Sequence, residues 1–212
     1  MKRQRRRVLG AGAAAVLSSL LPLPALADGS AGSVVGLFGQ CLVDRQGQGH
    51  RTPLKLGDAV AVADTIEVPA GGKLKLRMND GSIVSVASGT RMTVAAYQTD
   101  ASGQRQNAQL SLAGGLLRAV VAPVNRPSTF EVSTAVGTAA VRSTDWFVEA
   151  QPQAMQVGVL SGSVDLRSAA TGHSVTIPAR WGARLEAGLD PVPARTWSPA
   201  EFRAVISRTD VP

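Results

Sequence analysis

Residues 132–166 constrain the fold more than any other stretch of this 212-residue chain. Apolar and small or polar residues alternate there with a period of two. Because successive side chains of a strand point to opposite faces, this alternation predicts three or four short strands with one buried face. Pro152 and the Ser161–Gly162 pair mark the expected bends. The inward positions are predicted to be Val132, Ala139, Val141, Trp146, Val148, Met155, Val157, Val159, Val164 and Leu166.

The same pattern recurs toward the N-terminus. A first strand is predicted over residues 34–43, and Lys73–Met78 alternates three apolar residues with three cations. Asp80–Gly81 follows and predicts a hairpin with a type I′ turn, because both residue types tolerate positive φ. Gly114–Gly115 predicts a turn between two further strands, and residues 99–106 read as an exposed loop.

About a dozen such strands at short, regular spacing indicate an all-β domain. Two architectures fit this spacing, a short-stranded β-solenoid and a jelly-roll-like sandwich. The β domain is predicted to span residues 28–190, followed by an extended connector and a helix in residues 191–212.

The C-terminal helix has a clear start. Ser198 is a good N-cap, Pro199 suits the first helical position, and Glu201 completes a capping box. Phe202, Val205 and Ile206 share one narrow apolar face. We therefore expect this helix to cap the domain by covering an open end or edge of the β structure.

Residues 1–27 resemble a secretory signal peptide, so they are not expected to be part of the fold. Five basic residues precede an apolar run over residues 8–21, and Ala25–Leu26–Ala27 fits the small-residue cleavage rule, so cleavage is expected between Ala27 and Asp28. Arg5–Arg6 is also typical of a twin-arginine signal, and both this route and general secretion stay open. The apolar run is shorter than the ~20 residues of a membrane span, so no transmembrane anchor is expected after cleavage.

Removal of this leader changes the electrostatic interpretation. The whole chain carries +7, but five of its 22 basic residues and none of its 15 acidic residues lie in residues 1–27, which leaves +2. The remaining cations are scattered among few aromatic residues, so no nucleic-acid partner is expected. Cys41 is the only cysteine, which excludes an intrachain disulfide, and it is expected to be a buried, inert thiol.

No catalytic site is legible in the sequence, and neither a metal nor a cofactor is expected. His50 and His173 are far apart, and no Cys-x-x-Cys or His-Glu-x-x-His motif is present. Four aspartates at strand ends are expected to accept backbone N–H bonds: Asp58, Asp64, Asp80 and Asp145. A pair of carboxylates brought together by folding could instead hydrolyse a glycoside, and this alternative stays open.

A series of short phrases resembles the FecR domain family in order and spacing, over roughly residues 50–168. They include Leu56–Gly57–Asp58, Asp80–Gly81–Ser82 and Ala140–Val148. The resemblance assigns a structural role to the motif positions Gly57, Asp58, Asp80, Gly81, Gly115, Arg142, Thr144, Phe147 and Gly162. Ser143 departs from the family's usual glycine, so it would be strained if that position needs positive φ.

The resemblance implies an exported β module of the bacterial envelope, expected in the periplasm. FecR-like regulators also carry a cytoplasmic sigma-factor-binding segment and a transmembrane helix, which this sequence lacks, so direct anti-sigma activity is not expected. The leading interpretation is a non-catalytic module that binds an envelope protein or a wall or surface ligand. Two alternatives remain: an accessory component of envelope signal transduction that uses a sheet edge, and a wall hydrolase that uses the strand-end aspartates. The oligomeric state is left open.

Overall fold

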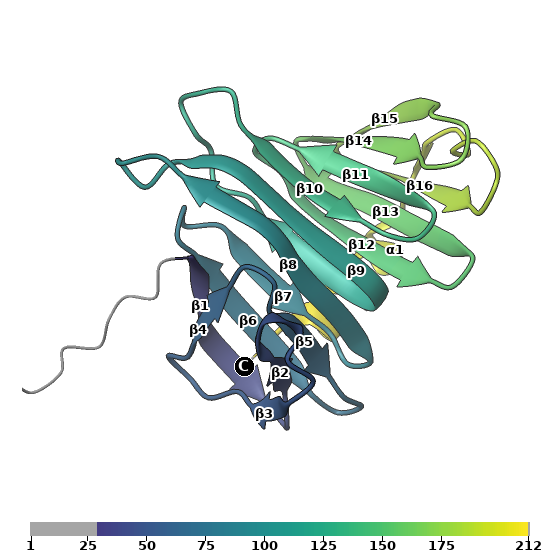
Figure 1. Cartoon of the computed structure of the whole chain (residues 1–212). Coiled ribbons are helices and arrows are strands. Elements are labelled where there is room, and N and C mark those ends of the chain that lie inside the picture. The colour runs from purple at the N-terminus through teal and green to yellow at the C-terminus, as the bar shows by residue number, and fades with distance from the viewer. Residues whose placement is uncertain (1–28, 212) are drawn as a thin grey trace, which may run out of the picture.

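The computed structural model describes residues 29–211, in which 17 strands form one continuous mixed sheet (Figure 1). The predicted leader and the cleavage position at Ala27 and Asp28 lie outside the described residues. The strands are β1 (Ser30–Phe38), β2 (Leu42–Asp44), β3 (Arg51–Pro53), β4 (Ala59–Ala61), β5 (Thr65–Val68), β6 (Lys73–Met78), β7 (Ile83–Val86), β8 (Thr90–Thr99), β9 (Arg105–Val120), β10 (Thr129–Ser133), β11 (Gly137–Val141), β12 (Asp145–Gln151), β13 (Ala154–Ser161), β14 (Ser163–Ser168), β15 (Ser174–Pro178), β16 (Trp181–Glu186) and β17 (Arg195–Thr196); a short 3-10 turn η1 (Arg45–Gly47) and the helix α1 (Pro199–Thr209) complete the fold.

The sheet is open and folds into two layers. Layer A runs β4-β1-β6-β7-β9-β12-β13-β16-β17, and layer B runs β3-β2-β5-β8-β9-β10-β11-β14-β15. The pair β9–β10 is parallel, whereas the other described pairs are antiparallel. The all-β prediction with one C-terminal helix is thus confirmed, as an open sheet and not a closed barrel.

Alternate side chains of the two layers meet in one apolar core that extends from Ala31 to Leu185. The alternation in β6 buries Leu74, Leu76 and Met78, as predicted, and Trp146 is fully buried. Residues 132–166 form parts of five strands, β10 to β14, and not three or four. The difference arises because the links between these strands are only one to three residues long, too short to interrupt the alternation.

The predicted turn at Gly114–Gly115 is wrong, because β9 runs through both glycines. Its first part pairs with β8 and β10 in layer B, and its last part pairs with β7 and β12 in layer A. Gly115 has a φ of +96°, which lets the strand bend from one layer into the other. A Cβ on Gly115 would lie 2.3 Å from Thr90 Oγ1, so the bend also needs the close approach that only glycine permits.

Two further local predictions need correction. Residues 34–43 do not form one strand, because Gly39 adopts a φ of +66° and separates β1 from β2. The β6–β7 hairpin is confirmed, but its turn is not type I′, since Gly81 has positive φ and Asp80 does not. Met78 O accepts from Gly81 N and Met78 N donates to Ser82 O, which defines a three-residue loop with Gly81 at the bulge position.

Helix α1 begins as predicted, with Ser198 and Glu201 forming both halves of a capping box. Its predicted location is wrong, because it covers the outer face of layer A and not an edge. Phe202 and Val205 pack there on Ala87, Leu116 and Phe147. Leu116 and Phe147 are next in sequence to residues of the main core, so their side chains point to the opposite, outer face of layer A. The helix therefore removes from water an apolar patch that the layer would otherwise expose. No helix within residues 29–211 has both the length and the apolar character needed to span a membrane.

Candidate functional site: a polar groove on layer B

The four strand-end aspartates are not brought together. Asp58 Oδ2 accepts from Lys55 N at 2.8 Å, and Asp64 accepts from the backbone N–H groups of Gln46 and Ala61. Asp145 is predicted to accept backbone N–H bonds, but it instead accepts two bonds, of 2.9 and 2.8 Å, from the Arg118 guanidinium across the β9–β12 pair. Each of these carboxylates therefore holds a turn or a strand pair.

Asp80 accepts from Ser82 N, as predicted, but it also forms a buried ion pair with Arg105. Neither side chain of this pair has any exposed surface. Arg105 is predicted from the sequence to lie in an exposed loop, and this prediction is wrong, because a lone arginine in a polar, glutamine-rich stretch carries no signal of burial. Only the pairing of β8 with β9 brings Arg105 next to the β6–β7 hairpin.

The Arg105 guanidinium also contacts the loops that follow β9 and β11. Its Nη2 donates to the carbonyl oxygens of Ala122 at 3.3 Å and Arg142 at 3.0 Å, and its Cζ lies 5.5 Å from the centre of the Phe130 ring. Tyr97 Oη accepts from Asp80 N at 2.8 Å, and burial, with the nearby Asp80 carboxylate as a smaller cause, raises the pKa of Tyr97. Arg105 thus fixes the backbone of residue 142 from inside the core.

The remaining motif residues lie mostly at turns. Gly57, Gly81, Gly115 and Gly162 all have positive φ. Thr144 is buried and its Oγ1 donates to Ser163 O at 3.1 Å, while Phe147 lies under helix α1. Ser143 does not adopt a positive φ, so the strain considered for a side chain at this position does not arise.

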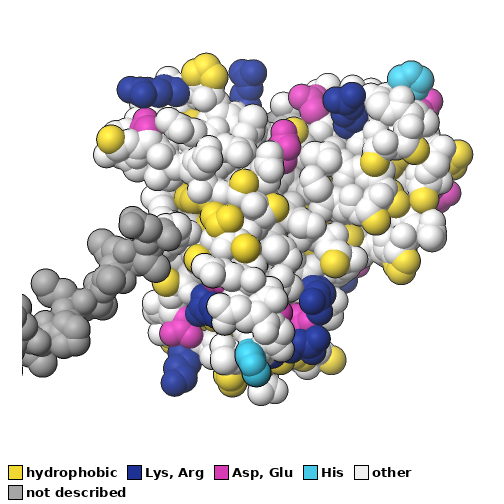
Figure 2. Space-filling model, viewed as in Figure 1, with side chains coloured by type: hydrophobic (Ala, Val, Ile, Leu, Met, Phe, Trp, Pro, Cys, Tyr) yellow, Lys and Arg dark blue, Asp and Glu magenta, His cyan; other side chains and the backbone are white. Residues whose placement is uncertain are grey.

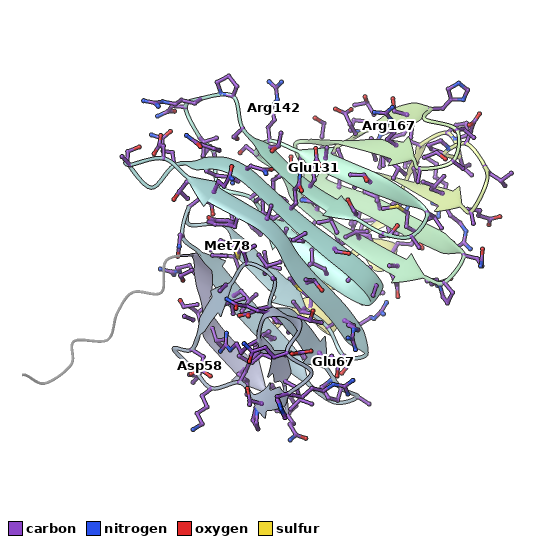
Figure 3. All side chains as sticks on the ribbon, in the orientation of Figure 1. Asp58, Glu67, Met78, Glu131, Arg142 and Arg167 are labelled. Atoms are coloured by element: carbon purple, nitrogen blue, oxygen red, sulfur yellow. The ribbon has the colours of Figure 1, made fainter. Side chains whose placement is uncertain are left out.

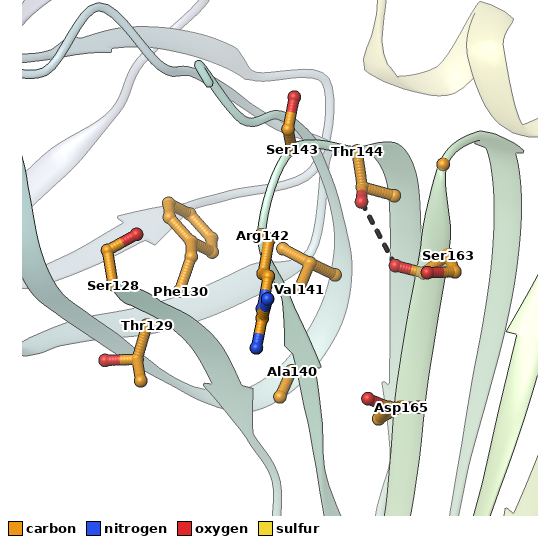
Figure 4. Close-up of a pocket in the computed structure, with 11 residues that line it drawn as sticks. Ser128, Thr129, Phe130, Ala140, Val141, Arg142, Ser143, Thr144, Ser163 and Asp165 are labelled. Atoms are coloured by element: carbon orange, nitrogen blue, oxygen red, sulfur yellow. Dashed lines mark hydrogen bonds between the residues drawn. The ribbon is translucent and has the colours of Figure 1, made fainter. Parts of the chain in front are cut away.

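Two adjoining hollows on the outer face of layer B form what we call the β11 groove. One, of about 540 Å³, is lined by residues of β10, β11 and β14 and by the turn after β11 (Figure 4). The other, of about 530 Å³, lies beside it and shares Ala140 and Asp165 as lining residues. The small side chain of Ala140 forms the floor between them. A third hollow, of about 400 Å³, continues the groove past Arg142 and Ser143 along the loop 123–128.

Four charged residues line the β11 groove: Glu131, Arg142, Asp165 and Arg167. Figure 3 labels Glu131, Arg142 and Arg167, and Figure 4 shows Arg142 between the side chains of β10 and those of β14. Within residues 29–211, the side chains of Glu131 and Arg142 have neither a hydrogen-bond nor an ion-pair partner. These two charges are therefore free to meet a ligand.

The arrangement favours binding by charge and hydrogen bonds. The groove is open to solvent, and the hydroxyl groups that line it include those of Ser128, Thr129 and Ser163. The described residues contain no cluster of three His, Cys, Asp or Glu side chains that could hold a metal. The family resemblance gave Arg142 a structural role, and no sequence pattern pointed to Glu131, Asp165 or Arg167, because only the register of three strands brings them to one groove.

The fold and the groove together define a two-layered, all-β module with a charged, open groove on one face. Residues 64–165 match the model of the family described as FecR protein, which is the family that the sequence resembles. The matched range includes Asp80 and Arg105. It also includes three of the four charged residues of the groove, Glu131, Arg142 and Asp165.

Two crystal structures share the fold. Both are of a proposed anti-sigma factor from Parabacteroides distasonis, at 1.65 and 2.50 Å resolution. Each matches with a TM-score of 0.55 and 17% sequence identity over 66% of this chain. This chain covers 63% and 62% of the length of those chains. A comparison with curated protein sequences found no match.

Proposed function

We propose that this protein is an exported module of bacterial envelope signal transduction that acts by binding and performs no reaction. The match to the FecR family over residues 64–165 is the observation that carries the proposal. The shared fold with a proposed anti-sigma factor supports the same role. The four strand-end aspartates support a non-catalytic reading, because each is engaged separately in a turn or an ion pair.

A binding role also agrees with the surface. In the view of Figure 2, acidic and basic side chains are interspersed over the visible face, which favours recognition of a specific charge pattern over attraction to a polyanion. The partner would be an envelope protein or a wall or surface ligand.

Capture of a partner tests this function. The full-length chain with a C-terminal tag, purified from envelope extract of its native bacterium, should retain one specific partner. Deletion of the gene that encodes this chain should change signal-dependent transcription. A specific partner together with altered transcription supports the proposal. Unchanged transcription and no retained partner would contradict it.

Export to the periplasm is part of the proposal and has its own test. Residues 1–27 fused to a reporter enzyme that is active only outside the cytoplasm should give activity. Replacing Arg5 and Arg6 by lysine should abolish that activity if the twin-arginine route is used, and should leave it unchanged for general secretion. A fusion that stays inactive would rule out export through these residues.

A further inference from the structure

The charges along the β11 groove follow the spacing of a strand. Thr138 and Ala140 on β11 and Arg142, one residue past the end of this strand, occur at every second position. Strand residues at this spacing lie about 7 Å apart. Ala140 lies in register between Glu131 on β10 and Asp165 on β14, and Thr138 lies in register with Arg167. Along the groove, a cation at Arg142 is followed by two anions and then by a second cation at Arg167.

All four groups have capacity for a ligand. Glu131 and Arg142 have no partner in the described part of the chain. Asp165 accepts one bond from Thr176 Oγ1 at 2.6 Å, which leaves its second oxygen free. Arg167 donates its Nε to Gly172 O at 3.1 Å, and its terminal nitrogens have no acceptor among residues 29–211.

A complementary ligand needs a cation between two anions, with about 7 Å between neighbouring charges. An extended peptide places side chains of every second residue on one face at the same spacing. We infer that the β11 groove binds an extended peptide segment with the pattern acidic-x-basic-x-acidic, whose central ammonium or guanidinium lies between Glu131 and Asp165 over Ala140. This inference rests on the proposed function, because it names the chemistry of the partner that such a module recognises.

The probe is a synthetic peptide, Ser-Glu-Ser-Lys-Ser-Glu-Ser, with blocked ends. Its control, Ser-Lys-Ser-Glu-Ser-Glu-Ser, has the same composition and net charge but the wrong order. Titration of the full-length chain, followed by amide chemical shifts, should move signals of β10, β11 and β14. The control peptide should bind about fivefold more weakly, because in no register does it place its cation between two anions.

Two double variants assign the contacts. Glu131→Gln with Asp165→Asn, and Arg142→Gln with Arg167→Gln, should each weaken binding of the first peptide about fivefold. Arg184→Gln with Glu186→Gln removes an exposed ion pair from layer A, outside the groove, and should leave binding unchanged. Added salt should weaken binding, since exposed charges are screened.

Equal binding of the two peptides, no binding at millimolar concentration, or shifts confined to layer A would each overturn the inference. Capture of the envelope partner distinguishes failure of this inference from failure of the proposed function. If wild type and the Glu131→Gln, Asp165→Asn variant capture the same partner equally well, the groove inference fails and the proposed function stands. If no partner is captured and the peptide still binds in a pattern-dependent way, the groove inference stands and the proposed function loses its support.

Discussion

Arg105 and Asp80 bring opposite charges into the core, where each compensates the other's loss of hydration. Replacing Arg105 by leucine would leave the Asp80 carboxylate buried without its cation, and we expect a loss of about 3–5 kcal/mol in the free energy of unfolding. The double variant Arg105→Leu, Asp80→Asn should recover at least about 1 kcal/mol of this loss. Urea unfolding measures both values.

The control for this prediction is Arg91→Leu. Arg91 pairs with Glu67, but its side chain is 50% exposed, so its loss should cost less than about 1 kcal/mol. A double variant as unstable as Arg105→Leu alone would contradict the interpretation of Arg105 as the counter-charge of Asp80.

Gly114 and Gly115 are neighbours with different structural requirements. Gly115→Ala should cost about 3 kcal/mol or more, because the residue has positive φ and the new Cβ would overlap Thr90 at 2.3–2.7 Å. Gly114→Ala should change the free energy of unfolding by less than about 0.5 kcal/mol, since no atom lies within 4 Å of the added Cβ. Thermal unfolding of the two variants side by side tests this contrast, and similar losses in both would argue against the close approach at the bend.

At the scale of elements, the start of helix α1 depends on the ionised Glu201 carboxylate. Its oxygens accept from Arg195 Nη2 and from Ser198 N, each at 2.7 Å, and these bonds lower the pKa of Glu201 to about 2. Because the pKa is lower in the folded state than the ordinary 4.5, the stabilisation is present above about pH 4.5 and is lost as the pH falls toward 2.

We therefore expect the carboxyl carbon of Glu201 to titrate near pH 2 in an NMR experiment. Over the same range, the Trp197 indole, which packs on Phe147 and Phe202, should become more exposed. In Glu201→Gln this acid-dependent change at Trp197 should be much smaller. A normal titration near pH 4.5 would show that the capping contact does not persist in solution.

At the scale of the whole molecule, one continuous core joins the two ends of the sheet, and β9 belongs to both layers. We expect urea unfolding of residues 29–211 to be a single transition, with tryptophan fluorescence and far-ultraviolet circular dichroism giving the same midpoint. Two separate midpoints would show that the layers, or the two ends of the sheet, unfold independently.

The sequence predicted best where one strand carries its own signal. The alternation in Lys73–Met78 and the capping box at Ser198 depend on residues close in the chain, and both are confirmed. The prediction failed at Gly115, where the same residue type serves a turn in one context and a bend within a strand in another. It failed at Arg105 because burial of a charge depends on a partner 25 residues away in the sequence.

The sequence by itself determined the all-β class, the C-terminal helix and the FecR resemblance, because strand alternation, capping and motif spacing are local properties of the chain. The tertiary structure decided the rest: the passage of β9 between layers, the helix on the outer face of layer A, and the charges along the β11 groove. The physical reason is that each of these features depends on cross-strand register and on packing between segments distant in sequence, which no local pattern encodes.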